Sequence, residues 1–388
     1  MRTATGGVRD DQIFVLCCCT AIVMLGVGIV SPILPLYAET FGVSYFLVGM
    51  VVSSFGMARI LTDMPAGYLA GRVGRRPLLL FGLCLFTISA ILAVVASSYE
   101  YLIAFRVVQG VGAAIFTTSA MTCLVDIVPE GQRTKYMGRY QGAIFVGLAL
   151  GPAVGGFLAE LGGFRAPFLS LFFLAAMSLV LAGAKISESL PARERGTISH
   201  GDSVSALRRF FRNRNLIIGN CAGAVIFITI GGIRMTAIPL YGQQAIHLSA
   251  GDIGIILALG AFSNFLVLLL TGAMTDRFGM KPLLICGFAL IALACYSFSF
   301  SGDFLSMTAA SVLLGAASGT VNPGQVTIVI DSSEVSLSVG MSRVFSDVGL
   351  ILGPLLVGVL SDQVSLTSPF LAAAFLSLLV AASISLLK

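Results

Sequence analysis

The sequence predicts an all-α membrane protein in which twelve transmembrane helices form two pseudo-symmetric six-helix bundles. Hydrophobic residues make up 57% of the 388-residue chain and charged residues only 11%, so a lipid bilayer is the expected solvent. Apolar runs of membrane-spanning length recur along the whole chain. One long polar interruption divides these runs into two sets of six.

A spanning helix needs about 20 apolar residues, and twelve runs are of that kind. They cover residues 13–37, 45–70, 77–97, 99–125, 138–160, 164–186, 216–240, 250–273, 282–301, 304–330, 337–360 and 368–387. We therefore expect an N-terminal six-helix bundle over residues 1–186, a cytoplasmic linker over 187–215 and a C-terminal six-helix bundle over 216–388.

The distribution of charge indicates the orientation of the chain. Alternate loops and the linker carry most of the Lys and Arg residues, whereas the opposite loops carry acids and a single basic residue, Arg165. The positive-inside rule then places both termini in the cytoplasm, with the chain crossing the inner membrane of the cell. This placement explains the net charge of +5 without a nucleic-acid partner.

The linker contains the stretch SVSALRRFFRNR, in which Val204, Leu207 and Phe211 have helical spacing with arginines between them. The pattern is typical of a basic amphipathic helix that lies on the inner membrane surface. The alternative is a solvated linker with one helical turn.

The two halves of the chain repeat three short stretches in the same order and at a nearly constant offset. This indicates a duplicated six-helix unit, which predicts a substrate cavity at the interface of the halves. The matching stretches are GYLAGRVGRRP (67–77) with GAMTDRFGMKP (272–282), RVVQGVG (106–112) with SVLLGAA (311–317), and GLALGPAVGG (147–156) with GLILGPLLVG (349–358).

These stretches, together with SPILP at residues 31–35, resemble motifs of the major facilitator superfamily over essentially the whole chain. Within that superfamily, the sequence most resembles the twelve-helix drug:proton antiporter branch. The resemblance implies the major facilitator fold and alternating access. It also implies efflux of small lipophilic organic compounds, driven by the proton gradient.

The resemblance assigns the repeated basic loops to a cytoplasmic gate. Their arginines cannot enter lipid and hold the inner ends of two helices at the surface, where Asp126 is the expected partner. The family pattern has an Asp at the position of Gly71, so we expect a gate that closes less firmly and favours inward-facing states. The candidate gate residues are Gly67, Gly71, Arg72, Gly74, Arg75, Arg76, Asp126, Asp276, Arg277 and Lys281.

The stretch at residues 147–156 resembles the antiporter motif of the fifth helix. Small residues at helical spacing give a smooth face for close helix approach, and a proline can kink the helix. Packing alone would justify this spacing, so the link to antiport rests on the resemblance. The candidate residues are Gly147, Gly151, Pro152, Gly155 and Gly156.

Ionisable residues at membrane depth cost several kcal/mol, so each is a functional candidate. Arg59 and Asp63 are four residues apart and share a helix face, where they can form a structural ion pair or a proton site. Arg343 and Asp347 repeat this spacing. Asp63 and Asp347 are the candidates for proton coupling, because a buried carboxylate suits that role.

Further polar residues are candidates for lining the substrate cavity. Arg106 aligns with Ser311 in the other half, so the duplicated scaffold does not require it. Arg234 lies near the outer end of its helix, where snorkelling is the alternative. Asn322 belongs to an NPG stretch that is expected to break helix ten. The full set is Arg59, Arg106, Gln109, Arg234, Asn264, Asn322 and Gln325.

The residues argue against an enzyme, because both histidines lie in loops and the HExxH and GxSxG motifs are absent. The eight cysteines fall in apolar runs without a CxxC pair, so we expect neither a metal site nor a cofactor. We expect a monomer that takes a small-molecule substrate. Helix one lacks the acid of many drug:proton antiporters, which leaves a carrier of organic anions or lipid-like solutes, or a non-transporting receptor or scaffold, as alternatives.

Overall fold

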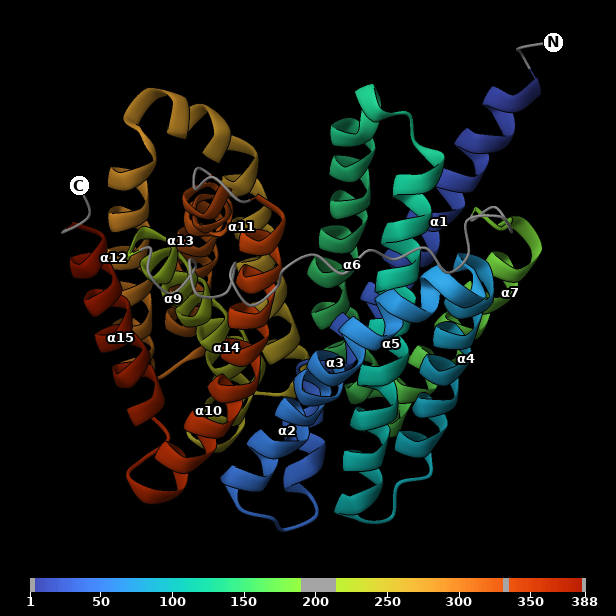
Figure 1. Ribbon diagram of the computed structural model, residues 1–388. Helices are drawn as coiled ribbons and strands as arrows, with labels where there is room; N and C mark the ends of the chain where they lie inside the picture. Colours follow the sequence, from blue (N-terminus) through green and yellow to red (C-terminus); the bar gives the residue numbers. More distant parts are fainter. Residues whose placement is uncertain (1–3, 190–213, 331–334, 386–388) are drawn as a thin grey trace. The chain divides into compact units, whose positions relative to one another are not determined.

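The predicted spans are helices in the computed structural model (Figure 1). The structure describes the backbone of residues 4–189, 214–330 and 335–385, and the side chains of 10–189 except 130 and 134, of 217–321 and of 344–385. Within this part of the chain, 12 helices are long and apolar enough to cross a membrane. The predicted all-α class and number of spans are confirmed.

Within each half of the chain the helices follow one another closely in sequence. In the first half they are α1 (Ala4–Val30), α2 (Ile33–Glu39), α3 (Tyr45–Val73), α4 (Arg75–Val94), α5 (Tyr99–Ile127), the 3-10 turn η1 (Glu130–Gln132), α6 (Arg133–Gly162) and α7 (Arg165–Lys185). In the second half they are α9 (Arg214–Ile228), the π-helix η3 (Thr229–Ala237), α10 (Ile238–Gln244), α11 (Ala250–Phe278), α12 (Met280–Phe298), α13 (Phe304–Ile330), α14 (Val335–Gln363) and α15 (Ser368–Ser385). The amphipathic helix expected around Val204 to Phe211 lies outside the described residues.

Two expected features of the spans differ in the structure. Helix α13 runs through the NPG stretch without a break, because a proline removes only one backbone hydrogen bond and membrane helices tolerate that loss. The first span, by contrast, is interrupted at Ser31 and Pro32, which separate α1 from α2. The irregular backbone therefore lies in the first span and not in the tenth.

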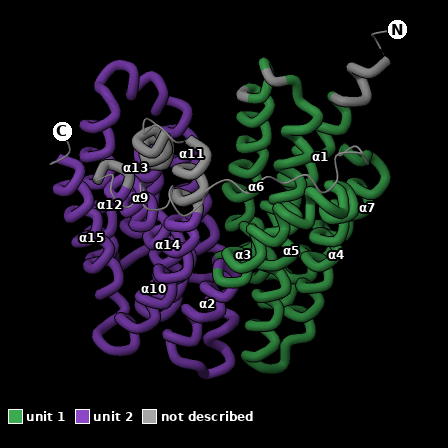
Figure 2. The backbone as a smooth tube through the Cα atoms, viewed as in Figure 1, with its two compact units in different colours: residues 1–31, 57–199 green, residues 32–56, 200–388 purple. Residues whose placement is uncertain are grey.

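The chain divides into two compact units, coloured separately in Figure 2. Unit 1 comprises residues 1–31 and 57–199, and unit 2 comprises residues 32–56 and 200–388. Helix α2 and the first part of α3, up to Gly56, therefore pack with the second half of the chain. Backbone N–H groups at the start of α3, from Tyr45 and Phe46, donate to the Asp362 carboxylate on α14 over 2.9 and 2.8 Å.

Glycines bring helices α1 and α6 of unit 1 into backbone contact. A methyl group at Gly147 would lie 2.5 Å from the carbonyl oxygen of Ala21, and one at Gly151 would collide with the backbone of Gly28. Gly155 faces the carbonyl of Ile29 in the same way. Since lipid supplies no hydrophobic force between helices, such close approach is what holds them together.

The same arrangement recurs in unit 2, where α14 packs on the seventh span. A methyl group at Gly349 would collide with the carbonyl of Ala224, and one at Gly353 would lie 2.7 Å from the amide nitrogen of Gly232. Helices α11 and α13 also meet through glycines, with Gly315 against the backbone of Gly260. The repeated sequence motif thus makes the same kind of helix contact in each unit.

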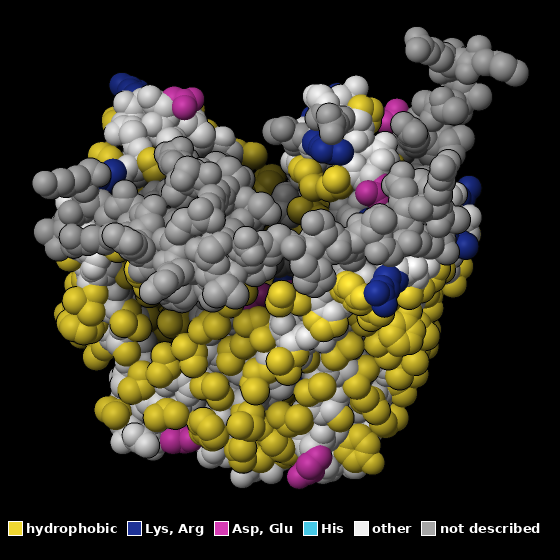
Figure 3. Space-filling view, in the orientation of Figure 1, with side chains coloured by type: hydrophobic (Ala, Val, Ile, Leu, Met, Phe, Trp, Pro, Cys, Tyr) yellow, Lys and Arg dark blue, Asp and Glu magenta, His cyan; other side chains and the backbone are white. Residues whose placement is uncertain are grey.

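The outer flanks of the helices carry apolar side chains. Leu61, Val180, Leu269 and Phe375 are all largely exposed. Figure 3 shows hydrophobic side chains over much of the visible flank. An exposed apolar surface of this kind fits a bilayer and not water.

Two glycines on α6 give a matched test of this packing. We expect Gly151→Ala to lower stability by about 1–3 kcal/mol, because the added methyl collides with α1. Gly142→Ala is the control: a methyl there meets nothing within 4 Å, and the gain in helix propensity is up to about 1 kcal/mol. Thermal unfolding in detergent, followed by circular dichroism, measures both. Equal melting temperatures for the two variants would contradict the role of Gly151.

Candidate functional site

An ion pair lies within the span formed by α3. The Arg59 guanidinium Nη2 lies 3.8 Å from Asp63 Oδ2, and the Thr118 hydroxyl on α5 donates to Asp63 Oδ1 over 3.3 Å. Both charged side chains are about one-fifth exposed, at 21% and 18%. Asp63 is therefore held by a cation and a hydroxyl, which offset part of the cost of placing a charge in the membrane.

A second polar group lies on α5. Arg106 is 7% exposed, and its Nη1 donates to Oε1 of Gln109 over 2.7 Å. Gln109 is fully buried, and its Nε2 forms no hydrogen bond with the described residues. These two sequence-predicted candidates therefore form one buried polar centre, and the Gln109 amide retains a donor.

The seventh span contains a nine-residue π-helix that sequence reasoning missed. Within η3 the Thr236 hydroxyl donates to the Gly231 carbonyl over 3.0 Å, and Arg234 is half-buried in the same segment. Gly231 and Gly232 face α14 at Leu350 and Gly353. The adjacent glycines in TIGGIRMTA were the available signal, since they weaken regular helix.

The glycines of α14 meet the seventh span where the π-helix begins. A methyl group at Gly353 would lie closest to the Ile228 carbonyl, just before η3, and 2.7 Å from the amide nitrogen of Gly232 within η3. In unit 1, a methyl group at Gly147 meets the carbonyl of Ala21 and the amide nitrogen of Leu25, which are likewise four residues apart. The π-segment thus lies at the helix contact, and such segments are frequent at functional sites.

The other intramembrane candidates lie in unit 2. Asp347 on α14 is 5% exposed and Asn264 on α11 is 6% exposed. Asp347 is thus buried, as its proposed role requires. The side chains of Asn322, Gln325 and Arg343 lie outside the described part of the chain.

The first copy of the basic loop joins α3 to α4 and is anchored at several points. The Nε of Arg75 lies 3.1 Å from Asp126 Oδ2 at the end of α5, so Arg75 is the arginine that pairs with this carboxylate. The backbone N–H of Arg75 donates to Glu188, and the Ser189 hydroxyl donates to Asp126, each over 2.9 Å. Arg76 donates to the Gly183 carbonyl over 2.8 Å. The segment after α7 therefore holds the loop, which sequence reasoning did not foresee.

The first basic loop lacks a carboxylate at Gly71, but the carboxylate of Glu188 contacts the same loop at Arg75. The N-terminus of α4 follows Gly74, whose φ of 117° suits glycine. The Glu188 carboxylate accepts from the first N–H of this helix, where a negative charge is favourable. Arg72 instead stacks on Tyr68, with its guanidinium carbon 4.5 Å from the ring centroid.

The second copy of the loop joins α11 to α12, with a glycine at the junction of the two helices. Gly279, with φ of 80°, ends α11 and begins α12. Asp276, Arg277 and Lys281 are exposed, and Arg277 stacks on Phe278 at 5.3 Å. The two loops have similar sequences but make different contacts: Arg75 of the first pairs with Asp126, whereas Arg277 of the second stacks on Phe278.

The described residues form twelve apolar spans, and several pairs of these helices meet at glycines. Together with charges inside the spans and irregular backbone in the first and seventh spans, these are features of a membrane carrier. The family model of the Major Facilitator Superfamily matches residues 16–265 and 221–388. This chain belongs to that superfamily, whose members are transporters and not enzymes. It is a secondary transporter of small molecules with twelve spans.

Individual relatives agree with this assignment. An uncharacterised transporter of the superfamily from Methanocaldococcus jannaschii is 24% identical over 387 residues, covering 96% of this chain and 97% of the relative. Multidrug resistance protein 2 of Bacillus subtilis is 26% identical over 363 residues, covering 91% and 89%. A solved D-xylose-proton symporter has a TM-score of 0.79 at 17% identity, covering 96% of each chain. This last likeness supports the fold alone.

A double-mutant cycle tests the anchor of the first loop. Arg75→Gln, Asp126→Asn and the double variant should show a coupling of about 0.2–1 kcal/mol, as expected for a partly exposed ion pair. Thermal unfolding at low and high salt provides the measurement, and the coupling should fall as salt rises. Strictly additive effects of the two single substitutions would rule out an energetic contribution from the pair.

Proposed function

We propose that this transporter exports small lipophilic organic compounds in exchange for protons, by alternating access. The observation that carries the proposal is the Asp63 carboxylate, held inside a membrane span by Arg59 and Thr118. Protonation of Asp63 would remove its charge and release Arg59, which gives a reversible change in the span. Similarity to a multidrug resistance protein supports the nature of the substrate.

The remaining candidates take roles that follow from their burial. We assign Asp347 as the second proton-coupling carboxylate, because it is buried within α14. Arg106, Gln109, Arg234 and Asn264 would contact the substrate, with the Nε2 of Gln109 as an available donor.

We also propose that both termini lie in the cytoplasm and that the protein acts as a monomer. The positive-inside rule supports this orientation, because Arg75, Arg76, Lys135 and Arg139 lie at the end of unit 1 that also carries the start of α1. This end is called the basic end below. We further propose that the six-helix bundles over residues 1–186 and 216–388 arose by duplication of one six-helix unit.

Drug tolerance tests the proposed function. Cells that express the protein should tolerate lipophilic cations and dyes better than cells with an empty vector, and Asp63→Asn or Asp347→Asn should abolish the gain because neither amide can carry the proton. Asp11→Asn is the matched control, since Asp11 is exposed at the start of the first span. Measurements are growth inhibition and dye efflux with and without a pH gradient. Efflux that persists in both variants without a pH gradient would exclude proton antiport.

A second function, transport of an organic anion or lipid-like solute, is favoured by the buried guanidinium of Arg106. An arginine at membrane depth suits a negatively charged group. If anionic substrates accumulate or leave in an Arg106-dependent manner while lipophilic cations do not, this function replaces drug efflux.

The missing carboxylate at Gly71 gives a prediction about the gate. We expect Gly71→Asp to shift the population toward outward-facing states, closed on the proposed cytoplasmic side, because a carboxylate there adds an anchor to the first loop. Spin labels at the proposed cytoplasmic ends of α3 and α14 report the distance between the two helices. Gly131→Asp is the control, since nothing lies within 4 Å of a methyl group at Gly131. Unchanged distance distributions in Gly71→Asp would refute this role.

A further inference from the structure

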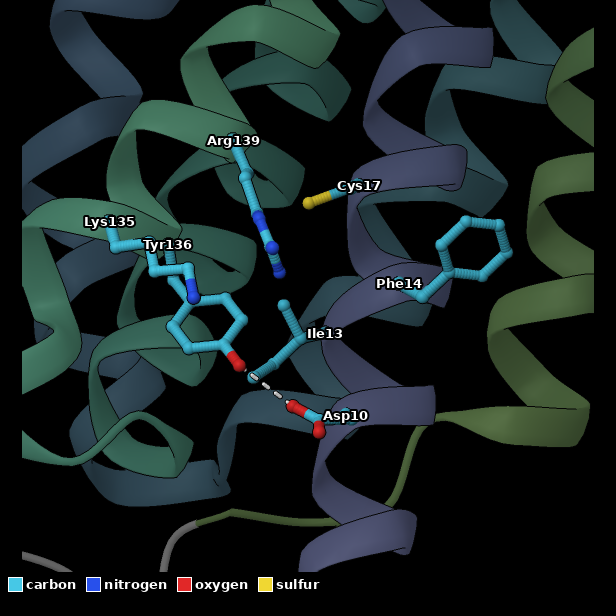
Figure 4. A pocket seen from close by; sticks show the side chains of 7 residues that line it. All are labelled: Asp10, Ile13, Phe14, Cys17, Lys135, Tyr136 and Arg139. Carbon is cyan, nitrogen blue, oxygen red and sulfur yellow. Dashed lines mark hydrogen bonds between the residues drawn. The ribbon is translucent and has the colours of Figure 1, made fainter.

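A cavity of about 580 Å³ lies between α1 and α6 within unit 1 (Figure 4). None of its residues belongs to the proposed proton, substrate or gate sets. It lies at the basic end, because Asp10 begins the first span and Lys135 begins the fifth. The cavity is lined by Asp10, Ile13, Phe14, Cys17, Lys135, Tyr136 and Arg139.

Two cations are held on one face of this cavity. Arg139 and Lys135 lie over the Tyr136 ring, at 5.0 and 6.0 Å from its centroid. The Tyr136 hydroxyl donates to Asp10 over 2.8 Å, and Figure 4 shows Arg139 extending from α6 toward Ile13 and Cys17 on α1. The aromatic ring thus fixes two like charges close together.

The charges of the cavity do not cancel. Among the described residues, neither Lys135 nor Arg139 forms an ion pair, and Asp10 is occupied by Tyr136. Two cations against one carboxylate leave one net positive charge, which matches the single negative charge of a phosphodiester. Ile13 is buried and Phe14 is 69% exposed, so an apolar edge adjoins the charged one.

We propose that this cavity binds the phosphate headgroup of an anionic phospholipid, with the acyl chains on the apolar side of α1. Basic pockets between transmembrane helices are suited to anionic headgroups. The position at the end of two spans is the depth at which a headgroup phosphate lies. The bound lipid bridges α1 and α6 next to their glycine contacts.

Native mass spectrometry and thermal unfolding of the purified protein test the site. Phosphatidylglycerol should bind and raise the melting temperature, whereas phosphatidylcholine at the same concentration should not. Arg139→Gln should weaken phosphatidylglycerol binding about fivefold, and Lys135→Gln provides a second variant should Arg139→Gln not fold. Arg133→Gln, which removes a charge from the same helix outside the cavity, should have a smaller effect.

Asp10→Asn makes the test more specific, because an anion site and a purely structural cavity predict different effects of this substitution on phosphatidylglycerol binding. Removal of its charge should strengthen phosphatidylglycerol binding if the cavity holds an anion, whereas a purely structural cavity would show no gain. Equal losses in Arg133→Gln and Arg139→Gln would overturn the proposal. Equal stabilisation by glycerol phosphate or inorganic phosphate would also overturn it, since the site would then serve a small soluble anion.

Discussion

The close approach of helix backbones at glycines is the constraint on which the rest of this structure depends. Apolar side chains gain nothing by leaving lipid for another helix, so packing must come from surfaces that fit closely. Gly151 provides such a surface against α1 and Gly353 provides it against the seventh span. These contacts set the depth and rotation of the first and seventh spans, which carry the irregular backbone of each unit.

Polar side chains inside the spans contact one another in small groups of two or three residues. Asp63 lies with Arg59 and Thr118, and Arg106 lies with Gln109. Each set lowers the cost of placing a charged or polar group at membrane depth.

The two halves share short sequence motifs, but the contacts that these motifs make differ between the halves. The first basic loop is tied down through Arg75, Asp126 and Glu188, whereas Asp276 of the second loop is exposed. The seventh span contains the π-helix η3, whereas the first span is interrupted at Ser31 and Pro32. The two halves therefore differ in local structure, although their sequences share the same glycine motif.

The sequence alone determined the helical class, the spans and the paired motifs, because membrane length and glycine spacing are local properties of the chain. It also placed Arg59 beside Asp63, since four residues return to the same helix face. Only the tertiary structure decided that Arg75 pairs with Asp126, that Glu188 caps α4, and that Asp10 meets Tyr136. These contacts join residues far apart in sequence, so helix packing and not local pattern selects the partners.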